Sequence, residues 1–117
     1  MAVNETREIV IDATPEEILD VLYDLEARTE WSSAHQEVEV RERNADGHPA
    51  KSRRVVKIVG ITDEQVLDYT VYDDGVGWTL VSSKQQRSQD ARYTLIPEGD
   101  KTRVKFQITV DPTVPLP

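Results

Sequence analysis

The sequence contains no cysteine, which excludes disulfides, thiol nucleophiles and cysteine-bound zinc. It has no apolar run near the ~20 residues that a membrane-spanning helix needs, and its N-terminus, MAVNETRE, lacks the apolar segment of a signal peptide. Bases are outnumbered by acids, 14 to 22, for a net charge of −8, which disfavours nucleic acid as a partner. We therefore expect one cytoplasmic domain that neither inserts into a membrane nor binds nucleic acid.

Motifs for catalysis and for metal binding are also missing. The two histidines, His35 and His48, have no second strong ligand at metal-binding spacing. No GxSxG, HExxH, P-loop or GxGxxG motif occurs. The carboxylates fall on positions predicted to face outward, and no acid pair converges in a cleft. We expect no catalytic residue, no metal and no cofactor, and whether the protein is an enzyme stays open.

The N-terminal third predicts a strand followed by two short helices. Residues 6–12 alternate as a strand does, with one apolar side. In the following segment, ATPEEILDVLYDLE, Thr14 is placed to cap a helix and Glu17 to complete a capping box. A second, shorter helix is expected over residues 27–34, anchored by Trp31.

The rest of the chain predicts six strands joined by short turns. Asp46-Gly47 is the strongest hairpin signal, and a polar link is expected over residues 83–89. Hairpin loops this short require antiparallel neighbours. The expected strands lie in residues 38–44, 51–60, 62–73, 78–83, 91–95 and 104–110. The prediction is an α+β fold with a seven-stranded antiparallel sheet that is apolar on one face.

Alternation assigns one set of side chains to that apolar face. The set is either a plain core against the helices or the lining of a cavity for a small molecule. Tyr69, Trp78, Ser82 and Tyr93 would supply polar groups in such a cavity. Arg54 shares this face, either at the cavity mouth or snorkelling to solvent. The candidate ligand-binding residues are Val56, Ile58, Leu67, Tyr69, Val71, Trp78, Leu80, Ser82, Tyr93, Leu95, Phe106 and Ile108, and Val38, Val40, Ala91 and Val104 share their face.

Five segments of the sequence are distinctive: REIVIDATPEEILDVLYDLE, the Glu30-Trp31 pair, GITDEQVLDYT, WTLVSS and ARYTLIPEGDKTRVKFQITVDPTVPLP. With them the chain resembles the START-like (birch-pollen-allergen-like, SRPBCC) superfamily, in particular small actinobacterial members of the bacterial polyketide cyclase/dehydrase and lipid-transport group. The resemblance implies a helix-grip fold, in which a long C-terminal helix crosses the concave face of a curved sheet. Since this sequence stops at DPTVPLP, we expect residues 1–117 to be a single START-like domain truncated before that helix.

The resemblance implies three functions. The first is binding or carriage of a hydrophobic small molecule, such as a lipid, polyketide or isoprenoid. The second is a polyketide aromatase/cyclase, whose chemistry would rest on tyrosine, serine or arginine at the cavity. The third is a protein-interaction module, supported by acids gathered in residues 5–30 and bases in residues 41–57. An uncovered apolar face also predicts self-association through the concave side of the sheet.

Overall fold

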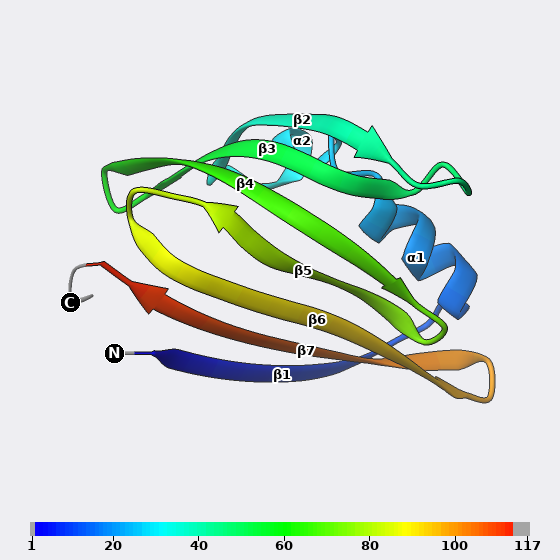
Figure 1. Ribbon diagram of the computed structural model, residues 1–117. Helices are drawn as coiled ribbons and strands as arrows, with labels where there is room; N and C mark the ends of the chain where they lie inside the picture. The colour runs from blue at the N-terminus through cyan, green and yellow to red at the C-terminus, as the bar shows by residue number, and fades with distance from the viewer. Residues whose placement is uncertain (1, 114–117) are drawn as a thin grey trace.

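The computed structural model describes residues 2–113, which form one curved antiparallel sheet with two helices (Figure 1). The strands lie in the order β1-β7-β6-β5-β4-β3-β2, and every neighbouring pair is antiparallel. The elements are β1 (Val3–Ile11), α1 (Pro15–Tyr23), α2 (Arg28–Trp31), β2 (His35–Arg43), β3 (Pro49–Ile58), β4 (Ile61–Tyr72), β5 (Gly75–Ser82), β6 (Gln86–Glu98) and β7 (Lys101–Pro112). The predicted α+β, helix-grip-like fold is confirmed.

Strand register places the apolar side chains on the concave face, as alternation predicted. Leu67 and Trp78 are buried there, whereas Asp68 and Thr79, the next residues along their strands, are exposed on the outer face. Because side chains alternate with a period of two, a slip by one residue would reverse both assignments. The register prediction is therefore confirmed at the centre of the sheet.

Helix α1 covers only one end of the concave face. Its buried Ile18 packs with Leu95 of β6 and Val104 of β7. In Figure 1 this helix lies at the end of the sheet where β1 finishes, while β1 starts and β7 finishes at the opposite end. We call that opposite end, bounded by Val3, by Pro112 and by the β3–β4 turn at residues 58–61, the open end.

Two local predictions are wrong. The second helix is a single turn, α2, and it buries Arg28 at 7% exposure while Trp31 is 63% exposed. One turn of helix can direct only part of its surface inward, so arginine, not tryptophan, anchors it. The predicted polar link is also wrong in part, because β6 already begins at Gln86 and Gln89 is buried.

The start of α1 supplies the first testable prediction. The Glu17 main-chain N–H donates to Thr14 Oγ1 at 3.2 Å, and the Thr14 N–H donates to Glu17 Oε1 at 3.1 Å. Thr14→Ala removes one acceptor from this capping box, so we expect it to lower the free energy of unfolding by about 0.5–2 kcal/mol. Asp20→Asn in the middle of the helix is the control and should change little. Urea melts measure both, and equal midpoints for Thr14→Ala and the parent would contradict the cap.

Candidate functional site

An apolar cavity of about 360 Å³ opens at the open end of the concave face. Strands β1 and β7 form one wall, and the β3–β4 hairpin forms the other. This volume lies within the range of small-molecule sites, which run from roughly 300 to 1,000 Å³. The apolar lining includes Val3, Val56, Ile58, Ile61, Ile108 and Val110, and the polar lining includes Asp63, Gln65, Gln85 and Gln86.

The structure brings only part of the predicted ligand set to this cavity. Val56, Ile58 and Ile108 line it. Leu95 instead packs beneath α1, and Val71 is 37% exposed. These two residues lie away from the cavity because the sheet is long and its two ends are covered differently.

The predicted aromatic residues form a cluster in the middle of the concave face. The ring centroids of Tyr93 and Phe106 are 4.5 Å apart, and Trp78 lies 5.9–6.0 Å from Tyr69, Tyr93 and Phe106. The rings are tilted relative to one another, and aromatic pairs prefer such arrangements to face-to-face stacking. Leu67, Leu80 and Ile108, which also belong to the predicted set, pack with this cluster. This cluster separates the core beneath α1 from the cavity.

The prediction that Ser82 lies on the concave face is wrong. Leu80 pairs with Leu67, but Ser82 pairs with Val66, so β5 carries one extra residue at this point. Such a bulge moves every later side chain to the other face. Ser83 takes the inward position, and its hydroxyl donates to Asp63 Oδ2 at 2.6 Å. Alternation alone could not place the bulge.

Arg54 lies on the concave face and is bonded to other strands. Its Nε donates to Gln65 Oε1 at 2.8 Å, and its Nη2 donates to Gln89 Oε1 at 3.0 Å. The guanidinium also lies 5.8 Å from the ring centroid of Trp78. Burial lowers the pKa of Arg54 from its ordinary value. The alternative in which Arg54 snorkels to solvent is therefore wrong.

From Arg54 a chain of polar side chains runs to the cavity. Gln65 Nε2 donates to Asp63 Oδ2 at 2.9 Å. On the other branch, Gln89 Oε1 also accepts from Trp78 Nε1 at 2.7 Å, and Gln89 Nε2 donates to Gln86 Oε1 at 2.7 Å. We call Arg54, Gln65, Asp63, Gln89 and Gln86 the polar chain.

Sequence reasoning missed the polar chain although a signal was present. Asp63 and Gln65 share the strand parity of Leu67, and Gln89 shares that of Ala91. Alternation selects a face by its apolar residues, so polar residues at inward-facing positions do not appear in the predicted set. Buried side chains of this kind are normally hydrogen-bonded to one another, so their common parity was the evidence for a network.

A second group of buried polar side chains lies beside α2. Burial and the charges of Arg54 and Arg28 lower the pKa of His35 to about 4, so its imidazole is neutral at pH 7. Arg28 makes no ion pair with any residue in the range 2–113. The space between these groups is only about 10 Å³, which is room for about one water molecule. It does not admit an organic ligand.

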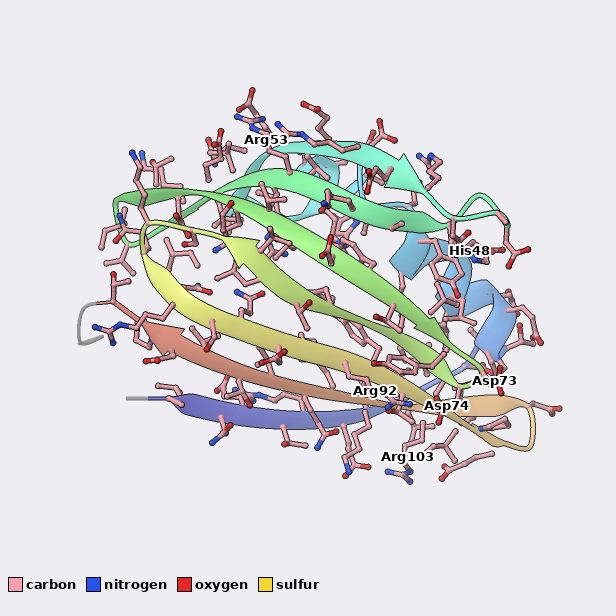
Figure 2. The ribbon with its side chains drawn as sticks, in the orientation of Figure 1. His48, Arg53, Asp73, Asp74, Arg92 and Arg103 are labelled. Carbon is pink, nitrogen blue, oxygen red and sulfur yellow. The ribbon has the colours of Figure 1, made fainter. Side chains whose placement is uncertain are left out.

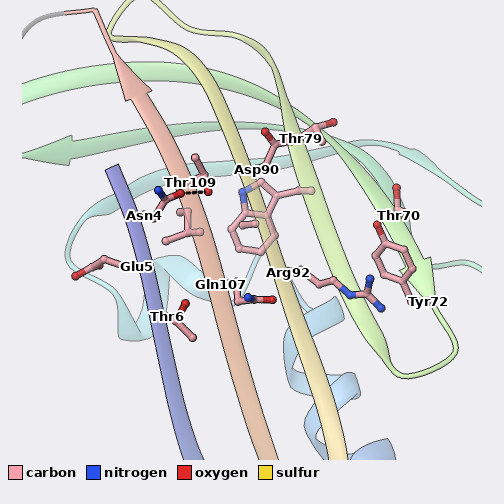
Figure 3. Close-up of a pocket in the computed structure, with 13 residues that line it drawn as sticks. Asn4, Glu5, Thr6, Thr70, Tyr72, Thr79, Asp90, Arg92, Gln107 and Thr109 are labelled. Atoms are coloured by element: carbon pink, nitrogen blue, oxygen red, sulfur yellow. Dashed lines mark hydrogen bonds between the residues drawn. The ribbon is translucent and has the colours of Figure 1, made fainter. Parts of the chain in front are cut away.

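The outer face is polar, and a depression beside Arg92 differs from the cavity. Figure 2 shows Arg53, Arg92 and Arg103 on this side of the sheet. The depression has about 510 Å³ and is lined largely by polar side chains such as Thr70 and Gln107 (Figure 3). Arg92 covers part of it, 3.8 Å above the Tyr72 ring. An open polar surface of this kind provides little apolar area for an apolar molecule to contact. The cavity at the open end is therefore the candidate site.

Comparison with known proteins agrees with this architecture. A family model described as polyketide cyclase/dehydrase and lipid transport matches residues 3–117. The chain belongs to this family. The sequence matches no curated protein. Among residues 2–113, no helix is both long and apolar enough to cross a membrane.

Several solved structures share this fold. A START superfamily protein from Mycobacterium smegmatis has a TM-score of 0.88 at 22% identity, covering 97% of this chain and 80% of that one. A protein from Thermus thermophilus, TTHA0849, has a TM-score of 0.83 at 22% identity, covering 97% and 77%. The ZhuI aromatase/cyclase from Streptomyces sp. R1128 has a TM-score of 0.83 at 9% identity, covering 99% and 72%. At these identities the likeness establishes the fold alone.

The polar chain makes a prediction about two adjacent arginines. Arg54→Met removes a donor from the buried acceptors Gln65 and Gln89, so we expect a loss of about 1–3 kcal/mol in the free energy of unfolding. Arg53 pairs with Glu64 at 2.7 Å across strands β3 and β4, and surface pairs contribute little. Arg53→Met is therefore the matched control and should melt close to the parent. Equal losses in the two variants, measured by urea melts, would contradict the interior role of Arg54.

The cavity rim makes a second prediction, about backbone strain. Val59 lines the cavity, is 86% exposed and has φ of 51°, a left-handed conformation that disfavours a β-branched residue. Asn is favoured in this conformation before a glycine, so Val59→Asn should raise the free energy of unfolding by about 1 kcal/mol. Because Val59 lines the cavity, the same substitution should weaken binding of an apolar dye. Val81→Asn, an exposed valine without positive φ, should not stabilise. Thermal melts and dye titrations test both, and a lower melting temperature for Val59→Asn would contradict the strain.

Proposed function

We propose that this protein binds and carries a hydrophobic small molecule in the cavity at the open end. The observation that carries the proposal is a space of about 360 Å³ with apolar side chains on both walls and a smaller number of polar groups among them. That composition is typical of small-molecule sites, in which few polar groups fix the orientation of an apolar ligand. The family's description, which includes lipid transport, supports the same function.

The expected affinity follows from the apolar area that a ligand would bury. A molecule that loses about 300 Å² of apolar surface to the cavity gains roughly 7 kcal/mol from water exclusion. Part of that gain is lost to the ordering of ligand and rim. We therefore expect dissociation constants of about tens to hundreds of micromolar, which suits reversible carriage.

The rim of the cavity suits entry and release. Ile58 and Ile61, which flank the β3–β4 turn, are 59% and 48% exposed. A ligand can therefore reach the cavity past exposed apolar side chains without unfolding of the sheet. Local motion of a hairpin end is fast compared with global unfolding. This placement favours a carrier over a protein that traps its ligand.

A cyclase or dehydrase is the second candidate, because one carboxylate borders the cavity. Asp63 is 6% exposed and lines the apolar space, and a carboxylate in such a place can accept a proton from a reacting molecule. Liquid chromatography with mass spectrometry of the ligand before and after incubation separates the two functions. A carrier returns its ligand with unchanged mass and retention time. A dehydrase returns it with a loss of water, and a cyclase returns a product of altered retention time even where the mass is conserved.

The proposal predicts how an apolar dye responds to substitutions on the two faces. Ile108→Asn puts an amide in the cavity wall, so we expect it to weaken binding of N-phenylnaphthylamine about fivefold to tenfold, as the loss of one apolar contact implies. Ile96 is an exposed isoleucine on the outer face, and Ile96→Asn is the control that should bind as the parent does. Fluorescence titration measures all three proteins. Absence of dye binding to the parent would favour the protein-interaction module instead.

A further inference from the structure

The hydrogen bonds of the polar chain have a direction that its ends impose. The Arg54 guanidinium and the Trp78 indole N–H can only donate, while the Asp63 carboxylate accepts. Gln65 and Gln89 must therefore present their oxygens to Arg54 and their amide nitrogens to the next residue in the chain. Arg54 and Trp78 can only donate. If the amide oxygen and nitrogen of either glutamine were exchanged, its amide N–H would face another donor.

This direction decides which groups remain free beside the cavity. Asp63 Oδ2 already accepts from Gln65 and Ser83, whereas Asp63 Oδ1 is buried and has no hydrogen-bond partner among residues 2–113. The Gln86 side chain uses its oxygen to accept from Gln89, and its amide nitrogen donates to no described residue. Both Asp63 and Gln86 line the cavity. Asp63 and Gln86 thus offer the cavity one strong acceptor and one donor.

A buried carboxylate oxygen without a donor is unfavourable. Leaving such an acceptor unpaired costs the desolvation of that atom, and native proteins rarely leave one. The torsion that carries an aspartate's carboxylate is broad, so a small turn of Asp63 can bring Oδ1 to a donor that enters the cavity. The donor is to be sought in the ligand, because the described side chains supply none.

We propose that the natural ligand is a neutral apolar molecule with a hydroxyl group, and that this hydroxyl binds between Asp63 and Gln86. It would donate to Asp63 Oδ1 and accept from Gln86 Nε2, with the apolar body against Val56, Ile108 and Val110. A hydroxyl is the simplest group that both donates and accepts. This inference rests on the proposed function, since it specifies the ligand of the same cavity.

Charge at the cavity argues against an acidic ligand. The lining includes the carboxylates of Asp63 and Glu5, and no lysine, arginine or histidine among the described residues lines it. A fatty acid would place a third negative charge in this apolar space, where like charges repel strongly. An amine would satisfy Asp63, but its charge must leave water and it offers Gln86 Nε2 no acceptor.

A series of compounds that share a ten-carbon chain tests the head group directly on the 117-residue protein. Decanol, decyl methyl ether, decanoate and decylamine each compete with bound N-phenylnaphthylamine. Decanol should displace the dye at about tenfold lower concentration than the ether, because a hydrogen bond to a charged acceptor is worth about that factor or more. Equal potency of the alcohol and the ether would overturn the proposal that a hydroxyl group is recognised, and it would leave the proposed function intact. If decanoate or decylamine displaces the dye more potently than decanol, the proposal that the ligand is neutral is overturned.

A pair of aspartates on strand β4 provides the matched variants. Asp63→Asn should reduce the preference for decanol over the ether to about twofold or less, since a neutral amide is a weaker acceptor, and should improve competition by decanoate. Asp68→Asn makes the same change on the exposed outer face and should keep the parent's preference. An unchanged preference in Asp63→Asn, confirmed as folded by its melt, would overturn the role of Asp63. Should that variant fail to fold, the compound series on the parent decides. Absence of binding by the dye and all four compounds would overturn the proposed function as well.

Discussion

The concave face of the sheet is longer than the helix that covers it, and the rest of the structure follows from this mismatch. Helix α1 has nine residues, or about 14 Å at the usual rise, whereas the described chain extends 43 Å along its longest axis. The face must therefore be covered in different ways along its length. Ile18 covers one end, the aromatic cluster around Trp78 covers the middle, and a cavity remains at the open end.

The polar chain is the means by which an arginine is accommodated on an otherwise apolar face. A buried guanidinium is costly unless its donors are used. Arg54 meets this condition with two glutamine side chains and the face of Trp78, and one glutamine connects it onward to the carboxylate of Asp63. Buried networks of this kind are stable only when each member is bonded. The unpaired Asp63 Oδ1 is the exception, and it occurs where the chain borders the cavity.

The general fold could be predicted from the sequence because its signals are local, whereas the candidate site could be predicted only in part. Alternation placed Leu67 and Trp78 inside, but no local signal marks the extra residue that turned Ser82 outward. Alternation also identifies a face by its apolar residues, so it does not find the polar groups that give a cavity its chemistry. The roles of Asp63 and Gln86 depend on which neighbour donates and which accepts, and that becomes known only when strands far apart in the sequence lie side by side.

Stability and recognition are largely separate in this fold. The contacts of α1 with β6 and β7 lie at one end of the concave face, and the cavity lies at the other. Substitutions at the exposed rim residues Ile58, Val59 and Ile61 therefore disturb few contacts of the core, which packs densely and tolerates change poorly. The strained conformation of Val59 fits the same division, because a turn outside the core can carry strain that the remaining structure compensates.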